Sequence, residues 1–118
     1  ATVELMRDAK EDFESLDGAA KKIVARALVK LRTSPEQRGA PLGSRNSGNL
    51  TGYRKLVVGK KTYRIVYEVY EDGSVCVVWV IAGRSDDECY DLAVSRTTQA
   101  SDEDRAKLKS ILDAAFNR

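Results

Sequence analysis

The sequence predicts an α+β fold in which an N-terminal strand and a helical hairpin pack on an antiparallel β-sheet, with further helices at the C-terminus. Residues 17–34 carry apolar side chains at the i, i+3, i+4 spacing of an amphipathic helix. Three strand-like runs follow between residues 53 and 82, and the last is rich in β-branched residues. Helical patterns then fill 86–95 and 101–116. This order predicts a sandwich with the helices over one face of the sheet.

The N-terminal third contributes one strand and two helices. Residues 2–6 alternate loosely between apolar and polar side chains, which predicts a short strand. A first helix is expected over 7–16, and a glycine separates it from the helix over 17–34. Asp17 is a suitable N-cap, and Ser34-Pro35 ends the second helix. Two helices with so short a connection predict an antiparallel hairpin.

The middle of the chain predicts a loop followed by the sheet. Residues 35–52 are rich in Gly, Pro, Ser and Asn and are expected to form a loop. Strands are expected over 53–58, 62–70 and 75–82, and the Asp-Gly pair within 71–74 is a strong hairpin signal. Residues 96–100 are expected to link the last two helices.

Length and charge limit the function only weakly. With 118 residues, of which 42% are hydrophobic, the chain is expected to form one soluble domain. Twenty basic and 18 acidic residues give a net charge of +2, which by itself does not indicate nucleic-acid binding. The basic residues are concentrated in 21–64, where Glu36 is the only acid, whereas the flanks are acidic. This asymmetry indicates either a basic binding face or an ordinary solvated surface.

The residue types that are absent exclude several kinds of catalysis. The chain has no histidine, which excludes Ser-His-Asp and Cys-His catalysis and His-His ribonuclease chemistry. Cys76 and Cys89 have neither a metal-binding spacing nor a disulfide framework, so we expect no metal, no cofactor and a reduced, cytoplasmic setting. No apolar run approaches the ~18–20 residues of a membrane span. Acid–base chemistry must therefore use Lys, Arg, Tyr or carboxylates.

The stretch YRKLVVGKKTYRIVY (53–67) predicts a hairpin with one apolar and one cationic face. Alternation puts Ile65 and Tyr67 on the core face and Arg64 on the other. A hairpin loop of two or four residues places Lys55 beside Arg64, whereas a loop of three residues places Arg54 there. We prefer the first register because it keeps Leu56 in the core.

Two cations on one sheet face repel each other unless an anion lies between them, so this face is a candidate phosphate site. The alternative is that Arg64 pairs with Glu68 or with an acid of the 86–91 helix. Arg84 follows the last strand directly, where a rigid support suits a functional side chain. Tyr90 lies further on, and the alternative for it is a ring packed against the sheet.

These residues together resemble the RelE/ParE superfamily of bacterial and archaeal toxins. The resemblance is carried by LTGYRKLVVGKKTYRIVYEV and VWVIAGRSDDECYDLAV, and by the order of hairpin, strands and Arg84…Tyr90. It covers a RelE-like domain over 1–96 and leaves 97–118 as a C-terminal helical extension. It implies a type II toxin–antitoxin toxin. RelE-like members enter the ribosomal A site and cleave mRNA without a metal, by attack of the RNA 2′-OH on the adjacent phosphate.

The resemblance also implies roles for particular residues. Arg64 would stabilise the pentavalent phosphate, and Arg84 would do the same or protonate the leaving oxygen. Tyr90 would stack on or orient the scissile nucleotide. Lys55, or Arg54 in the other register, would be the base or would act electrostatically. The RNA-binding residues expected outside the chemistry are Arg54, Lys60 and Lys61.

Partners and alternatives follow from the same resemblance. The expected partners are a RelB-like antitoxin, the ribosome and mRNA, with no membrane. The antitoxin would cover the basic face or displace the C-terminal helix. RelE has two alternating lysines before the hairpin, whereas here the second position is Leu56 or Val57. The alternatives are a ParE-like toxin that inhibits DNA gyrase and a catalytically inactive binding module.

Overall fold

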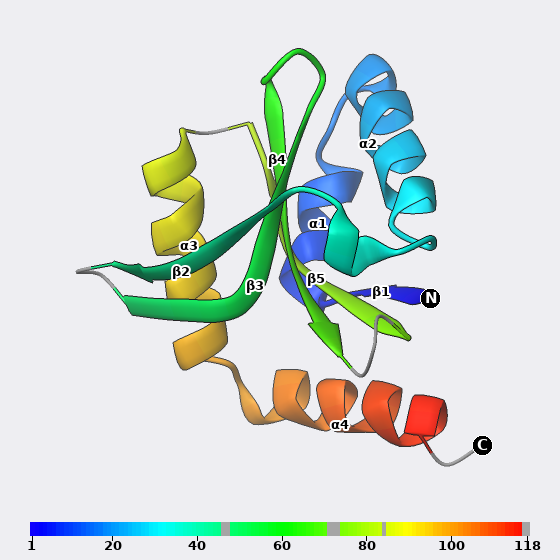
Figure 1. The fold of residues 1–118 in the computed structure, drawn as a ribbon, viewed down its shortest axis with the longest axis vertical. Coiled ribbons are helices and arrows are strands. Elements are labelled where there is room, and N and C mark those ends of the chain that lie inside the picture. Colours follow the sequence, from blue (N-terminus) through cyan, green and yellow to red (C-terminus); the bar gives the residue numbers. More distant parts are fainter. Residues whose placement is uncertain (46–47, 71–73, 84, 117–118) are drawn as a thin grey trace.

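The computed structural model describes residues 1–45, 48–70, 74–83 and 85–116. Figure 1 shows a central sheet with helices on both sides of it and a last helix across one end. The elements are β1 (Thr2–Leu5), α1 (Arg7–Glu14), α2 (Gly18–Lys30), the 3-10 turn η1 (Pro35–Gln37), β2 (Ala40–Arg45), β3 (Gly48–Val58), β4 (Tyr63–Tyr70), β5 (Val75–Ala82), α3 (Asp86–Thr98) and α4 (Asp102–Phe116).

The sheet has five strands in the order β1-β5-β4-β3-β2. The predicted antiparallel arrangement is confirmed for β2 to β5, but β1 pairs with β5 in parallel, so the sheet is mixed. The parallel pairing is possible because the chain between β1 and β5 crosses the whole sheet before it returns. The expected α+β class is therefore confirmed, with one parallel pair added.

The hairpin of β3 and β4 has the register that keeps Leu56 in the core. Val58 pairs with Tyr63, so four residues form the connection, and Leu56 pairs with Ile65 on the α2 side of the sheet. Gly59, Lys60 and Lys61 all have positive φ, between 57° and 70°. Lys55 and Arg64 consequently lie on the opposite face from Leu56, as the loop-length argument predicts.

The prediction of a loop over 35–52 is wrong for most of that range. Residues 40–45 form the edge strand β2, and β3 begins at Gly48, five residues before the expected start. Pro41 and Gly43 weaken the strand pattern, but an edge strand tolerates Pro, and the pairing is irregular between these two residues. Gly43 and Gly52 each have φ of 93°, which suits glycine.

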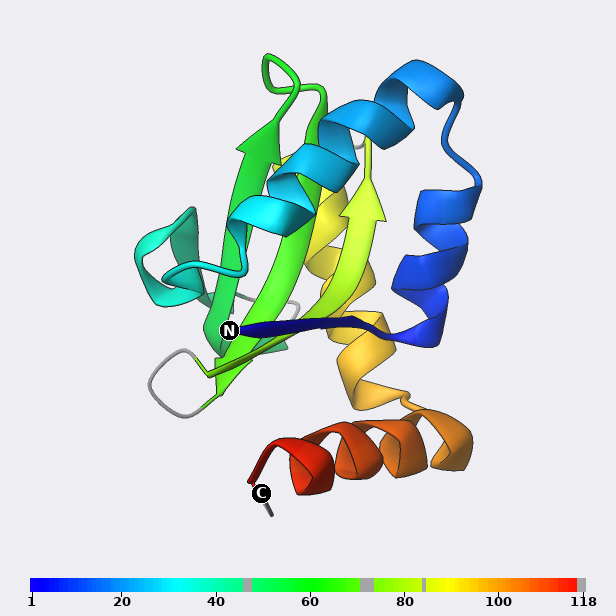
Figure 2. The same ribbon diagram turned by 90° about the vertical axis from the view of Figure 1, so that its right-hand side faces the viewer.

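Helices cover both faces of the sheet, so the prediction that they share one face is wrong. Ala9 of α1 and Val24 of α2 pack with Ile65 and Tyr67 in one core. Tyr90 and other α3 residues pack with Val66 and Trp79 in a second core on the opposite face. Figure 2 shows α2 in front of the sheet and α3 behind it. The sheet is therefore the middle layer of three.

A β-bulge in β5 supplies side chains to both cores. The pairing with β4 shifts between Val66 and Tyr67, which pair with Val80 and Val78 and leave Trp79 as the extra residue. Trp79 and Val80 consequently both pack in the α3-side core, while Val78 and Ile81 pack in the α2-side core. All of residues 75–81 are buried, which explains why the strand is almost entirely apolar.

The C-terminal helices are also placed by specific contacts. α3 continues to Thr98, so the expected linker over 96–100 is wrong for its first three residues. Ser101 Oγ accepts from the Asp104 amide at 3.1 Å, as expected for the start of α4. Apolar side chains of α4 (Leu108, Ile111 and Leu112) pack against the α3-side core. Within the described ranges, no helix has the length and apolar character that crossing a membrane requires.

Candidate anion site on the sheet

Lys55 and Arg64 lie together on the α3 side of the sheet and hold a carboxylate between them. Lys55 Nζ is 3.0 Å from Asp86 Oδ2, and Arg64 Nε donates to Asp86 Oδ1. Arg64 Nη1 also donates to the Lys61 carbonyl oxygen at 3.2 Å. The predicted cation pair is therefore present. Of the alternatives for Arg64, an acid of the 86–91 helix is its partner, whereas Glu68 contacts Tyr70 instead.

Burial differs sharply among the three residues. The side chains of Lys55 and Arg64 are 18% and 16% exposed, whereas that of Asp86 is 45% exposed. Hydrogen bonds from Arg64 and then Lys55 hold the pKa of Asp86 below its usual value, so this carboxylate stays ionised at neutral pH. The cations are thus fixed on rigid strands, and the anion approaches them from the surface.

Asp86 is placed by the start of α3. Ser85 is the N-cap: its Oγ accepts from the Glu88 amide at 3.2 Å and donates to the Glu88 carboxylate at 3.1 Å. The pattern Ser-x-x-Glu of a capping box is visible in the sequence, and here the Glu88 carboxylate accepts from the Ser85 hydroxyl. The helix therefore begins at Asp86 without needing the Asp86 side chain for its cap.

Two of the expected site residues lie elsewhere in the fold. Tyr90 is 1% exposed in the α3-side core, and its hydroxyl donates to the Gly43 carbonyl oxygen at 2.7 Å. Arg54 lies on the α2 side, where its Nε donates to the Arg38 carbonyl oxygen at 2.7 Å. The structure does not bring either residue to Lys55 and Arg64. Arg84 lies outside the described residues.

The lysines at the hairpin tip are exposed but separate from the cation pair. Lys60 and Lys61 occupy the connection between β3 and β4, and both side chains are open to solvent. Only the Lys61 backbone reaches the site, through its carbonyl oxygen on Arg64. Among the residues that the structure describes, no three carboxylate or cysteine side chains gather closely enough to hold a metal ion.

A second titratable cluster lies further along the same face. Glu68 pairs across the strands with Tyr53, and the Tyr70 hydroxyl donates to the Glu68 carboxylate. Burial raises the pKa of Glu68, although the hydrogen bonds from the two tyrosines act in the opposite direction. Burial and this carboxylate also raise the pKa of Tyr53 and of Tyr70. The cluster therefore contains a half-buried acid, Glu68, that folding makes harder to ionise.

We expect Glu68→Gln to stabilise the protein at neutral pH. A raised pKa in the folded state means that the folded chain binds the proton more tightly than the unfolded chain, where the ordinary value is 4.5. The stability that Glu68 contributes is therefore present below pH 4.5 and is lost as the pH rises through its folded pKa. The gain from Glu68→Gln should be largest at neutral pH and should shrink on acidification.

Urea unfolding of both proteins over a series of pH values measures this difference. Glu36→Gln, at an exposed glutamate of η1, is the control for a change from acid to amide. The contribution of Asp86 has the opposite sign, but it is common to both proteins and cancels in the comparison. A gain that is the same at every pH would contradict this account of Glu68.

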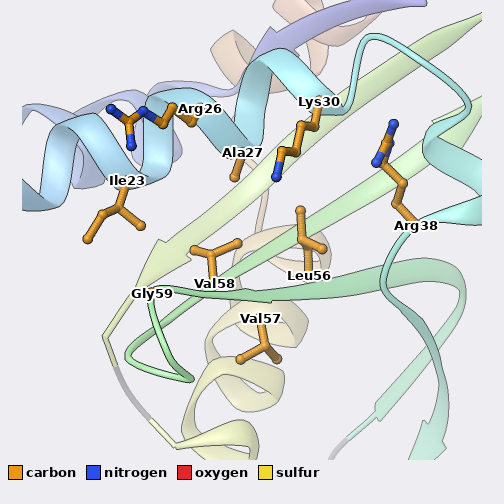
Figure 3. A pocket seen from close by; sticks show the side chains of 9 residues that line it. All are labelled: Ile23, Arg26, Ala27, Lys30, Arg38, Leu56, Val57, Val58 and Gly59. Carbon is orange, nitrogen blue, oxygen red and sulfur yellow. The ribbon is translucent and has the colours of Figure 1, made fainter.

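A basic groove lies on the other side of the sheet, between α2 and β3. It has a volume of about 440 Å³ and is lined by Ile23, Arg26, Ala27, Lys30, Arg38, Leu56, Val57, Val58 and Gly59. Figure 3 shows Leu56 and Val58 pointing from β3 toward α2, while Val57 points to the opposite side. Three of the lining residues are cations: Arg26 and Lys30 of α2, and Arg38, which follows η1.

The charge of this groove is not balanced locally. Among the described residues, no acidic side chain lines it, and neither Arg26 nor Lys30 forms an ion pair. The side chain of Arg38 bonds to the backbone: its Nε donates to the Thr33 carbonyl oxygen at 2.8 Å. The groove is not among the features predicted from the sequence, although Ile23, Ala27 and Lys30 follow a helical spacing that places them on one face of α2.

Comparison with known proteins places this geometry in a family. Residues 3–88 match the family model described as ParE toxin of the type II toxin–antitoxin system parDE. No curated protein sequence gives a significant match.

Solved structures with a similar fold are toxins and toxin–antitoxin complexes. The isolated RelE toxin of E. coli is 21% identical with a TM-score of 0.58, over 81% of this chain and 97% of that one. A RelBE toxin–antitoxin complex from Mycobacterium tuberculosis is 25% identical with a TM-score of 0.59, over 70% and 96%. A double arginine-to-alanine variant of E. coli RelE in the free state is 21% identical with a TM-score of 0.63, over 80% and 95%. The family match spans most of the chain and the fold agrees with it, so the protein belongs to the ParE family of toxins of type II toxin–antitoxin systems, within the RelE/ParE superfamily.

Proposed function

We propose that this toxin is a ribosome-dependent mRNA endoribonuclease that acts in the cytoplasm. The observation that carries the proposal is the pair of Lys55 and Arg64, two largely buried cations on adjacent strands that already hold two oxygens of one anion. A phosphodiester also presents two oxygens to such a pair. Charge-assisted hydrogen bonds from a preorganised Arg and Lys are the usual means of binding phosphate.

The proposed reaction needs no metal. The 2′-oxygen of the RNA forms a bond to phosphorus, the bond from phosphorus to the 5′-oxygen breaks, and a 2′,3′-cyclic phosphate and a 5′-hydroxyl result. Arg64 would stabilise the extra negative charge on the pentavalent phosphate, because its guanidinium is fixed where that charge develops. Lys55 would assist electrostatically or accept the 2′-OH proton. Arg84 keeps its proposed role at the leaving oxygen.

The remaining residues take other roles in this proposal. Lys60 and Lys61 would contact RNA phosphates from the hairpin tip, since both are exposed. Arg54 binds the carbonyl oxygens of Arg38 and Gly39, so we assign it to holding that segment rather than to binding RNA. The buried ring of Tyr90 would have to leave the core to stack on a base, so we assign it to holding β2 against α3.

Inhibition of DNA gyrase is the second candidate. Two observations favour it: the matching family model is that of ParE toxins, and Lys55 is ion-paired with Asp86 rather than free to act as a base. A gyrase inhibitor would need the same surface only for binding. Both candidates therefore use the fold, but only the first requires chemistry at the cation pair.

Induced expression of the toxin separates the two candidates. Primer extension on a reporter mRNA should show codon-phased cleavage within minutes if the toxin cuts mRNA in the ribosomal A site. Intact mRNA together with DNA damage, and loss of supercoiling by purified gyrase, would favour the second candidate. Absence of any growth defect would contradict both and would indicate an inactive binding module.

We further propose that the partner is a RelB-like antitoxin and that an acidic amphipathic segment of it occupies the groove between α2 and β3. The groove offers apolar side chains on its floor and unbalanced cations on its rim, which suit an occupant with an apolar stripe and carboxylates beside it. This face is separate from the cation pair, so the segment anchors the antitoxin without entering the anion site.

We expect the double variant Arg26→Glu and Lys30→Glu to bind the adjacent-gene antitoxin about 10- to 100-fold more weakly, because like charges then face its carboxylates. Titration calorimetry measures the affinity. The matched control is Arg105→Glu with Lys109→Glu, an exposed Arg and Lys at the same i, i+4 spacing on α4. An equal loss in the control, or a loss only there, would place the antitoxin elsewhere.

A further inference from the structure

We propose that Asp86 is a built-in competitor of the substrate phosphate, a carboxylate that fills the Lys55–Arg64 site until a stronger ligand displaces it. The inference rests on the proposed function, in which that site binds phosphate. It adds a residue that restrains the site. Each oxygen of Asp86 takes one cation, Oδ2 from Lys55 and Oδ1 from Arg64, so the carboxylate occupies the place that two phosphate oxygens would take.

The three side chains differ in how easily they can move. Lys55 of β3 pairs with Ala40 and Val66, and Arg64 of β4 pairs with Val57 and Ala82, so a strand on each side holds both backbones. Asp86 is the first residue of α3, and its side chain is about half exposed. Rotation of Asp86 toward solvent therefore removes the anion and leaves both cations in place.

The start of α3 is stable without the Asp86 contact. Ser85 caps the helix through the Glu88 amide, and Cys89 and Tyr90 anchor its first turns in the core. Displacing the carboxylate therefore breaks the ion pairs of Asp86 with Lys55 and Arg64 but leaves the packing of α3 in place. The two arrangements, Asp86 bound and Asp86 released, differ only in which anion the cations hold.

The charge of Asp86 makes the competition persistent. The same cations that it occupies keep its pKa below the usual value, so at neutral pH the carboxylate is ionised and stays in the site. A ligand that binds only the released arrangement loses affinity in proportion to the fraction of molecules that are released. Free phosphate is held by the two cations alone, so its affinity is reduced by this whole factor. An RNA strand is also held by contacts elsewhere, and these compensate for the loss of affinity at the cation pair.

The test is the affinity of the full chain for inorganic phosphate, measured by titration calorimetry in every variant and also by the nuclear magnetic resonance signal of Arg64 Nε–H in the variants that keep Arg64. Asp86→Ala and Asp86→Asn should both bind phosphate roughly two- to fivefold more tightly than the parent protein, since half-exposed ion pairs contribute about this much. The matched control is Asp91→Asn, which removes the same charge from an exposed position of α3. It should leave the affinity unchanged.

Three results would overturn the inference: unchanged affinity in both Asp86 variants, an equal gain in Asp91→Asn, or a gain that persists when Arg64→Ala is added to Asp86→Ala. The first would mean that Asp86 does not compete, and the second that only net charge matters. The readout does not require RNA cleavage. Tighter phosphate binding without any nuclease activity would refute the proposed function and leave this inference standing.

Discussion

Arg64→Ala is expected to abolish toxicity and to reduce mRNA cleavage by about 100-fold or more. Arg64 is the cation best placed to stabilise a pentavalent phosphate, and removing one preorganised donor of this kind typically costs 10²- to 10³-fold in rate. The fold should survive, because neither core is built from Arg64, whose side chain donates to Asp86 and to the Lys61 backbone. Primer extension and growth after induction measure the effect, and circular dichroism confirms the fold.

Two further variants make this result specific. Arg64→Lys keeps the charge but loses the planar fork, so it should retain only part of the activity. Arg32→Ala removes an exposed arginine beyond α2 and should change nothing. Full cleavage by Arg64→Ala would refute the site. Gyrase inhibition by the parent protein that weakens in this variant would support the second candidate. Arg84→Ala is expected to lose toxicity as well, on the strength of the resemblance.

The hairpin that carries the cations is predictable from sequence because its signals are local. Alternation along residues 63–69 and the length of the connection together fix which side chains share a face, and Lys55 and Arg64 do lie together. The carboxylate that joins them comes from the 86–91 helix, and an acid of this helix is one of the alternative partners stated for Arg64. What pattern alone does not choose is which acid of α3 arrives there, since that depends on the angle of the helix to the sheet.

Other features escaped prediction for physical reasons. β2 and the first half of β3 contain Pro41, Gly43 and Gly52, which are poor strand residues and are stabilised here by their position at an edge and by the Tyr90–Gly43 hydrogen bond. The two-sided burial of β5 had a visible signal, because an unbroken apolar run indicates a strand covered on both faces. The same reasoning would have placed α3 opposite α2 and Tyr90 in the core.

Asp12→Ala is expected to be the most destabilising of the substitutions considered, lowering the free energy of unfolding by about 3 kcal/mol. β1 pairs with β5 only as far as Val78, so no strand of the described residues lies beside the rest of this edge of β5. Asp12 of α1 closes this edge: its Oδ2 accepts from the Ile81 amide at 3.0 Å and from Arg96 at 2.6 Å. Arg96 in turn donates to the Trp79 carbonyl oxygen at 2.9 Å.

Removing the Asp12 carboxylate leaves an amide and a guanidinium without their partner at a place where water has little access. The side chains of Asp12 and Arg96 are 19% and 16% exposed, so solvent only partly compensates. Because Arg96 belongs to α3 and Asp12 to α1, the pair also ties the two outer layers together around the edge of the sheet. Chemical denaturation of the variant and the parent protein measures the loss.

Asp8→Ala is the matched control, because Asp8 belongs to the same helix and approaches the same arginine. Asp8 Oδ2 is 3.8 Å from Arg96 Nε and its side chain is 37% exposed, so its loss should cost less than about 1 kcal/mol. Adding Arg96→Met to Asp12→Ala should recover part of the loss, since the uncompensated charge is then gone. Equal effects of Asp8→Ala and Asp12→Ala, or no recovery in the double variant, would show that the β5 edge does not depend on this pair.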